Sequence, residues 1–311
     1  MARKLRVQYP GAIYHVLSRG DRREAIFLDD GDRDGFLIAV GEVCEKSGWE
    51  VHALCLMDNH FHLVVETPQG NLVAGMKWLL GTYTMRFNRR HRRSGHVFAG
   101  RYKALVVDGT GDGYFRTVCD YVHLNPARAG LLAADERLVT YRWSSWPEYM
   151  KTPGKRWPWL RVDRLMGESG VPKDSAAGRR ALERAIEARR SGDVPVEYAA
   201  IRRGWCFGDE TFRQELLAQV SERMGAEHYG SERAESAEVQ AERLIRKELR
   251  HRGWEESDLE ERAKGDRMKV ELAARLRAET LMSVKWIAAR LHMGTAGHLN
   301  NRLYHWRKGL L

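Results

Sequence analysis

The pattern of apolar and polar positions in the N-terminal half of the chain switches between a period of two, typical of strands, and a helical period. Residues 12–17 alternate and are rich in β-branched and aromatic side chains, which predicts a first strand. Asp58-Asn59 reads as a tight turn between two further apolar stretches. The whole pattern predicts strands at 12–17, 49–56, 60–66 and 102–107, and helices at 30–47, 71–90 and 113–124, the last ended by Asn125-Pro126.

This order of elements, strand–helix–strand–strand–helix–strand, predicts a ferredoxin-like split βαβ fold of the α+β class. Its four strands would form one antiparallel sheet with helices on one face. The strand at residues 60–66 would be a central strand of that sheet. The helix at 113–124 would follow the last strand.

The C-terminal half lacks the strand period and is rich in Glu, Arg and Ala. Its pattern predicts only helices, at 175–190, 209–224, 231–251 and 257–278. We therefore expect three parts: an α+β domain at residues 1–150, a linker at 151–174 and an all-α region at 175–311.

The end of the chain, residues 280–306, has the pattern of a helix-turn-helix. Ser283 is an expected N-cap, and His292-Met293-Gly294 is the expected turn before a second helix. Short helix pairs with a glycine turn also occur in plain helical bundles, so two interpretations stay open. If the pair reads DNA, outward Asn and Arg side chains of the second helix would contact base edges. These are Asn300, Asn301 and Arg302.

Two histidines, His60 and His62, lie two positions apart in a predicted strand. Side chains on a strand alternate between faces, so both imidazoles point the same way while Phe61 points into the opposite layer. Two neutral imidazoles at this spacing can grip a divalent metal ion. Taken alone, the short motif fits two half-buried histidines that bond to neighbours better than it fits a metal site.

Tyr121 and Asn125 lie four positions apart at the end of a predicted helix, and therefore on one face of it. That face could present a phenol and an amide oxygen to one site. Taken alone, the pair also fits a tyrosine at the edge of the core and an asparagine that caps the helix. Asp120 lies about 100° round the helix, and we give it no role in the site.

Between these two elements, residues 67–107 contain no Asp or Glu. Unbalanced basic charge with interleaved aromatic rings suits single-stranded nucleic acid, because cations neutralise phosphates and rings stack on unpaired bases. A merely exposed, basic helix end is the alternative. The aromatic residues are Tyr83, Phe87, Phe98 and Tyr102. The basic residues that we expect to contact DNA here are Lys77, Arg86, Arg89, Arg90, Arg101 and Lys103, together with Arg19.

Composition agrees with a polyanionic partner. The chain of 311 residues has a formal net charge of +10 and an isoelectric point of about 9.5, which favours nucleic acid over an acidic small molecule. Four cysteines without a C-x-x-C pair suggest reduced thiols. No apolar run is long enough to span a bilayer, and no signal peptide is evident. We expect a cytoplasmic, nucleoid-associated protein without a membrane partner.

The joint pattern resembles the HUH single-tyrosine transposases, the insertion-sequence-200-like enzymes, and more closely their REP-associated members. The resemblance covers roughly the first 150 residues. The matching motifs are Tyr14-His15-Val16, Arg19-Gly20, His60-Phe61-His62, Phe98-Ala99-Gly100-Arg101-Tyr102-Lys103, Asp120-Tyr121-Val122-His123-Leu124-Asn125-Pro126-Ala127-Arg128-Ala129-Gly130 and Trp143-Ser144-Ser145-Trp146.

This resemblance implies specific roles. His60, His62 and Asn125 would hold Mg²⁺ or Mn²⁺, and Tyr121 would be the nucleophile that leaves a 5′-phosphotyrosine and a free 3′-OH. The DNA partner would be single-stranded with hairpins. The insertion-sequence members carry Gln where this chain has Asn125, and residue types alone leave Zn²⁺ open. No second tyrosine lies one turn from Tyr121, which argues against the two-tyrosine branch.

Three functions remain to be separated. The first is a DNA transposase, a single-strand endonuclease and strand transferase that works through Tyr121. The second is a sequence-specific DNA-binding regulator whose catalytic centre is vestigial. The third is a metal-dependent hydrolase that uses water. The sequence leaves open the target DNA sequence, the oligomeric state (monomer or homodimer) and the role of residues 175–278.

Overall fold

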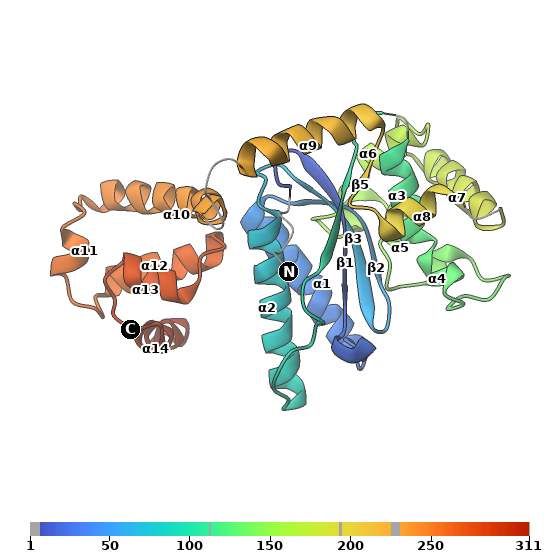
Figure 1. Cartoon of the computed structure of the whole chain (residues 1–311). Helices are drawn as coiled ribbons and strands as arrows, with labels where there is room; N and C mark the ends of the chain where they lie inside the picture. The colour runs from blue at the N-terminus through green and yellow to red at the C-terminus, as the bar shows by residue number, and fades with distance from the viewer. Residues whose placement is uncertain (1–6, 112, 193–194, 225–230, 311) are drawn as a thin grey trace. The chain divides into compact units, whose positions relative to one another are not determined.

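The computed structural model describes residues 7–111, 113–192, 195–224 and 231–310, and its first part is an α+β unit built on one sheet (Figure 1). The sheet order is β2-β3-β1-β4-β5, and the first four strands pair antiparallel. This is the strand order of the predicted ferredoxin-like fold, with the histidine strand β3 between β2 and β1. The strands are β1 (Ala12–Arg19), β2 (Glu50–Leu56), β3 (His60–Thr67), β4 (Lys103–Val107) and β5 (Cys206–Phe207).

The fifth strand was not predicted, since we expected only helices beyond residue 174. β5 pairs in parallel with the edge strand β4. The backbone N–H of Val106 donates to Trp205 O at 2.9 Å, and that of Asp108 donates to Phe207 O at 2.8 Å. A strand of two residues is too short to show a period of two in the sequence, so only its pairing reveals it.

Helices cover both faces of the sheet, which corrects the expectation of helices on one face (Figure 1). On one face lie α1 (Asp30–Ser47) and α2 (Leu72–His91), where the rings of Phe36 and Phe61 are 4.7 Å apart. On the other face lies α3 (Tyr114–His123), where Tyr121 packs against His62 of β3. Alternation along β3 thus sends Phe61 into one layer and His62 into the other.

The segment expected to be a linker, residues 151–174, is part of the first compact unit. Leu160 bridges in parallel to Val51 of β2, and the N–H of Arg161 donates to Val51 O at 2.8 Å. Leu165 and Met166 are buried. The Pro, Gly and Trp content that suggested a linker therefore belongs to a segment packed on the edge of the sheet. The remaining elements of this unit are η1 (Asp21–Arg23), α4 (Asn125–Arg128), η2 (Leu138–Thr140), α5 (Trp146–Met150), η3 (Pro153–Lys155), α6 (Asp163–Glu168), α7 (Ala176–Arg190), α8 (Glu197–Arg203) and α9 (Glu210–Met224).

A second compact unit contains the C-terminal helices from residue 228 onward, together with residues 45–47 and 71–78. Its helices enclose a hydrophobic core of their own, which includes Ile245, Leu272 and Leu299. Within the described residues, no helix of the chain is both long and apolar enough to cross a membrane. The helices are α10 (Ser231–Arg252), α11 (Asp258–Glu261), α12 (Arg267–Glu279), α13 (Val284–Arg290) and α14 (Ala296–Arg307).

The last two helices begin where the sequence predicted. Ser283 caps α13 by accepting a hydrogen bond from the N–H of Trp286, and Thr295 caps α14 in the same way through His298. Gly294 has φ = 82° in the turn between them, a backbone conformation that favours glycine. The helix starts and the glycine turn match the prediction, whereas the helix-turn-helix motif itself and its binding of DNA stay predictions.

The motif Trp143-Ser144-Ser145-Trp146 closes the free edge of β2. The N–H of Leu56 donates to Trp143 O, and that of Ser145 donates to Leu54 O, both at 2.8 Å. The Ser145 hydroxyl accepts from the N–H of Leu54 at 2.9 Å and lies 2.8 Å from His123 Nε2. One serine therefore ties α3 to the sheet, and burial lowers the pKa of His123 to about 3.

Gly20 is required by a close backbone approach at the end of β1. A Cβ atom at this position would lie 2.1 Å from the carbonyl oxygen of Glu24. We predict that Gly20→Ala lowers the free energy of unfolding by about 2–3 kcal/mol or more, because backbone must move to relieve the clash. Gly81→Ala is the control: it lies in α2 with nothing within 4 Å of its Cβ, and should be neutral or stabilise by up to about 1 kcal/mol. Urea unfolding measures both. Equal stability of the two variants would contradict this assignment.

His123 gives a pH dependence with a defined sign. Because its folded pKa of about 3 lies below that of the unfolded chain, about 6.5, protonation favours the unfolded chain. The stability that neutral His123 contributes to the folded state is therefore lost as the pH falls below about 6.5 toward 3. Between about pH 6.5 and pH 5 this amounts to about 2 kcal/mol. We predict that His123→Gln flattens the pH dependence of urea unfolding by this amount, whereas His251→Gln, at an exposed position, leaves it unchanged. An unchanged slope in His123→Gln would contradict the assignment.

Candidate active site

Antiparallel pairing of β1 with β3 sets the position of both histidines. Arg19 faces His60 across the pair, and Leu17 faces His62. His62 is buried, whereas His60, at the start of the strand, is half-buried. The two rings lie 5.0 Å apart between centroids. The structure thus confirms that they share one face of the sheet.

The neighbouring turn residue Asn59 fixes the tautomer of His60. Asn59 Nδ2 donates to the backbone oxygen of Arg23 at 3.0 Å, which orients the amide. Its Oδ1 then lies 2.7 Å from His60 Nδ1 and must accept the proton carried there. The lone pair of His60 Nε2 is left for another partner, such as a metal ion.

His62 has a partner that the sequence did not single out. His15 Nε2 lies 2.9 Å from His62 Nδ1, and the two rings are parallel within 6° at 5.1 Å between centroids. His15 comes from β1, two positions from Leu17, which faces His62. Strand register decides this contact. The sequence does not give the register between β1 and β3. Alternation along β1 therefore places His15 on one face of the sheet but does not predict its contact with His62.

The electrostatics of the site keep its imidazoles neutral. Burial lowers the pKa of His15 to about 4. Burial, and then the charge of Arg19, lowers the pKa of His60 to about 4 as well. Burial, then His15, His60 and Arg19, holds the pKa of His62 well below its usual value. Neutral imidazole is the form that binds a metal ion, so the site suits metal ligation at physiological pH.

Tyr121 on α3, the helix that packs on the histidine face of the sheet, covers the site. Its ring centroid lies 5.7 Å from that of His62 and 5.6 Å from that of His15, both edge-on. Only 8% of Tyr121 is exposed. Tyr198 of α8 contacts it at 5.0 Å between ring centroids, and the Arg128 guanidinium lies 4.1 Å from the Tyr198 ring. A helix beyond residue 174 therefore forms part of the wall beside Tyr121.

Asn125 lies one turn after Tyr121, at the first residue of α4. The predicted helix end is close, since α3 ends at His123 and the backbone re-enters a single helical turn. One amide atom of Asn125, Nδ2, is buried, and nothing in the described parts of the chain pairs with it. A half-turn of the carboxamide exchanges its nitrogen and oxygen, so this unused position also suits an oxygen ligand to a cation. The donor types present, two neutral imidazoles and an amide with an unpaired buried atom, therefore suit a divalent metal.

Asp120 has a structural role. It is a buried residue of α3 and forms an ion pair of 2.8 Å with Arg189 of α7. Burial raises its pKa to about 6 despite that arginine. This ion pair links α7 to α3, whereas Tyr121 of the same helix contacts the histidines of the sheet.

The predicted basic stretch divides into two groups. Arg86 donates to both carboxylate oxygens of Glu42 at 2.8 Å, and Arg90 pairs with Asp29 and Asp32. Acids from α1 therefore balance charges that look unbalanced along the sequence. Outside the ion pairs of Arg86 and Arg90, the exposed members of the set are Arg19, Lys77, Arg89, Arg101 and Lys103.

The aromatic residues of the same stretch lie in the core, which corrects the expectation that they stack on bases. Tyr83, Phe87, Phe98 and Tyr102 are all buried, with 8% exposure or less. Phe98 contacts Phe61 of the sheet. The spacing of these residues along the sequence places their rings in the apolar layer under α2. A buried ring has no free face on which a base could stack.

The polar residues on α14 differ in exposure. Asn300 and Asn301 are exposed, while Arg302 is half-buried. Leu299 and Leu303 are buried on the opposite side of the same helix. The two amides are thus free to meet a partner, and DNA recognition by them stays a prediction.

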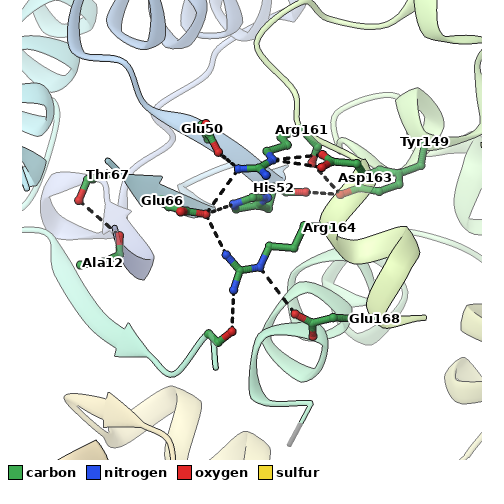
Figure 2. A network of polar contacts seen from close by, with 11 residues as sticks. Ala12, Glu50, His52, Glu66, Thr67, Tyr149, Arg161, Asp163, Arg164 and Glu168 are labelled. Carbon is green, nitrogen blue, oxygen red and sulfur yellow. Dashed lines mark hydrogen bonds and ion pairs between the residues drawn. The ribbon is translucent and has the colours of Figure 1, made fainter. Parts of the chain in front are cut away.

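A second polar cluster has the composition of a metal site but a different role (Figure 2). Among the residues that the structure describes, ligand atoms of Glu50, His52 and Glu66 lie within 4.8 Å of one another. Arg161 pairs with Glu50, while Arg164 donates to Glu66 at 3.0 Å. The bond from His52, and then these guanidinium charges, lowers the pKa of Glu66. Because two guanidinium groups already neutralise the carboxylates, we assign the cluster to fastening α6 and the segment before it to the sheet.

No curated protein matches this chain. Among solved structures, a REP-associated tyrosine transposase bound to a REP hairpin aligns with 53% of this chain and 93% of its own, at 15% identity and a TM-score of 0.41. A proposed transposase from Deinococcus radiodurans R1 aligns with 42% of this chain and 92% of its own, at 21% identity and a TM-score of 0.28. At these TM-scores neither likeness supports a conclusion about this chain.

The family comparison is more specific. Residues 8–125 match the family described as transposase IS200 like. The matched segment runs from before β1 to Asn125 and so includes both histidines of β3 and Tyr121. Over this segment, which is less than half of its length, the chain is similar to the IS200-like transposases.

Proposed function

We propose that this chain is a transposase of the IS200-like family, of its REP-associated kind, and that it cuts and rejoins single-stranded DNA through Tyr121. The observation that carries the proposal is the packing of the Tyr121 ring against His62 and His15, at 5.7 and 5.6 Å between centroids. A phenol beside neutral imidazoles is the arrangement that metal-assisted attack on a phosphodiester requires.

The proposed step conserves the number of phosphoester bonds. The Tyr121 oxygen loses its proton and bonds to the phosphorus, while the bond from phosphorus to the 3′ oxygen breaks. The 3′ oxygen takes up a proton and leaves as a free 3′-OH. The 5′ end stays on the enzyme as a phosphotyrosine, and another 3′-OH can reverse the step and join strands.

His60, His62 and Asn125 would hold the divalent cation, Mg²⁺ or Mn²⁺. When bound, that ion supplies Lewis-acid polarisation of a phosphate oxygen. The chain's own residues supply the rest: burial keeps the imidazoles neutral, and exposed Arg19 lies opposite His60 in the strand pair. Its guanidinium suits a backbone phosphate next to the reacting one.

The proposed substrate is single-stranded DNA with hairpins formed by repeat sequences. This class follows from the resemblance of the motifs up to Trp146 to REP-associated transposases. The exposed cations Arg89, Arg101 and Lys103 would contact the backbone of such a strand without reading its sequence. Asn300 and Asn301 of α14, with Arg302 at its half-buried flank, would help to recognise the duplex part.

The Tyr121→Phe variant tests the nucleophile. We predict that wild-type protein with Mn²⁺ forms a covalent adduct with 5′- and 3′-labelled hairpin DNA, and that Tyr121→Phe reduces adduct formation by at least about a thousandfold, because the attacking oxygen is gone. Denaturing gels measure the adduct. Tyr198→Phe is the matched control: its ring packs beside Tyr121, and loss of its hydroxyl should leave the adduct in place.

Other outcomes of that gel would identify the competing functions. Cleavage without an adduct, unchanged in Tyr121→Phe, would assign the protein to the hydrolases that use water. Tight binding without cleavage would favour the sequence-specific regulator, for which the exposed polar face of α14 is the supporting observation.

A double variant tests the role of α14. We predict that Asn300→Ala with Asn301→Ala weakens binding to the hairpin substrate by about 10–100-fold, because each lost base contact costs about 1–3 kcal/mol. The rate of adduct formation at saturating DNA should not change. Fluorescence anisotropy measures the affinity, with Gln214→Ala, an exposed amide on α9, as the control. Unchanged affinity in the double variant would rule out this recognition helix.

A further inference from the structure

We propose that His15 is a positioning residue that fixes the tautomer and the ring orientation of the metal ligand His62. The inference rests on the metal-binding part of the proposed function. It concerns a residue of β1 that lies in the matched motif Tyr14-His15-Val16 but was given no role from the sequence. Its basis is the hydrogen bond of 2.9 Å between His15 Nε2 and His62 Nδ1.

The bond involves the one nitrogen of His62 that does not have to bind the metal. A histidine binds a metal through one ring nitrogen, and the hydrogen bond made by the other nitrogen decides which one is free. Since Nδ1 of His62 faces His15, the lone pair at Nε2 is available to a cation. The two rings are parallel within 6°, so β1 also restrains the ring plane of His62.

The protons of the pair can be placed in only one way for this role. His62 carries its proton on Nδ1 and donates it to Nε2 of His15. His15 therefore carries its own proton on Nδ1. Both rings stay neutral, and no proton has to leave His62 when a metal binds at Nε2.

The Nδ1 atom of His60 is also held by a hydrogen bond, but to a residue of a different kind. Its Nδ1 donates to Asn59 Oδ1 at 2.7 Å, and that amide is oriented by its bond to Arg23 O. Both histidines of β3 thus have Nδ1 held by a neighbour, while Nε2 has no hydrogen-bond partner among the described residues. Two different partners that leave the same nitrogen open point to ligation, since packing of the two rings alone would not require it.

The burial of His15 supports the same conclusion. Only 5% of it is exposed, in the middle of a strand with apolar neighbours. Burying a polar ring costs free energy unless its nitrogens are paired, and an apolar ring would fill the space at lower cost. The hydrogen bond from His62 to His15 therefore explains why a polar residue occupies this buried position.

Two substitutions of nearly equal polarity separate positioning from packing. His15→Gln keeps an acceptor at the reach of Nε2, whereas His15→Asn is shorter by one methylene and loses that reach. With full-length protein and Mn²⁺ alone, we expect calorimetry to show affinity lowered about 10–100-fold in His15→Asn and nearly restored in His15→Gln. The control His52→Phe replaces an equally buried histidine of β2 that bonds Glu66 instead, and should leave Mn²⁺ affinity unchanged.

A second measurement does not need the metal. Nitrogen-15 spectra of the histidines in metal-free protein should show His62 protonated at Nδ1 in wild type and in His15→Gln, and a mixture of tautomers in His15→Asn. Equal Mn²⁺ affinity in the Gln and Asn variants with an unchanged His62 tautomer would overturn the proposal. If wild type binds no Mn²⁺, the metal assignment in the proposed function fails. The tautomer of His62 then still decides whether His15 positions it: a changed tautomer in His15→Asn supports the proposal, and an unchanged one overturns it.

Discussion

The antiparallel pairing of β1 with β3 is the constraint on which the rest of the site depends. It sets Arg19 opposite His60 and Leu17 opposite His62. It also brings His15 within 2.9 Å of His62. A slip of one residue would send every side chain of the strand to the other face. Phe61 would then meet Tyr121, and the imidazoles would enter the apolar layer under α1 and α2.

The two layers around the sheet explain why the register is so strongly specified. One layer is apolar, with Phe36 against Phe61 at 4.7 Å. The other contains the polar site, where Tyr121 covers His15 and His62. The apolar rings of one layer and the imidazoles of the other cannot exchange places without burying unpaired imidazoles or exposing apolar rings. Both changes cost free energy.

Much of this could be predicted from the sequence because it depends on short-range periodicity. The alternation around Phe61, the turn at Asp58-Asn59 and the one-turn spacing from Tyr121 to Asn125 each fix local geometry. Together they gave the order of the first four strands and the shared face of His60 and His62. The cap Ser283 and the turn at His292-Met293-Gly294 marked the starts of the last two helices for the same reason.

What the sequence did not give depends on contacts between distant segments. Strand register decides the contact between His15 and His62. The acids that pair with Arg86 and Arg90 lie on α1 or at its N-cap, so an acid-free stretch of sequence is not unbalanced in the fold. The rings of Tyr83 and Phe98 were assigned to nucleic acid from their spacing, but three-dimensional packing buries them. β5 and Tyr198 connect the expected C-terminal region to the catalytic layer through pairings that carry no local signal.

In the proposed reaction Tyr121, beside two neutral histidines of β3, attacks the DNA backbone. This attack can be tested by locating the residue that carries the linked nucleotide. The covalent complex of full-length protein and hairpin DNA is digested with a protease, and the linked peptide is identified by mass spectrometry. The account predicts a 5′-phosphate ester on the Tyr121 side chain and on no other residue. A nucleotide linked to a different tyrosine, such as Tyr198, or cleaved DNA without any linked peptide, would contradict it.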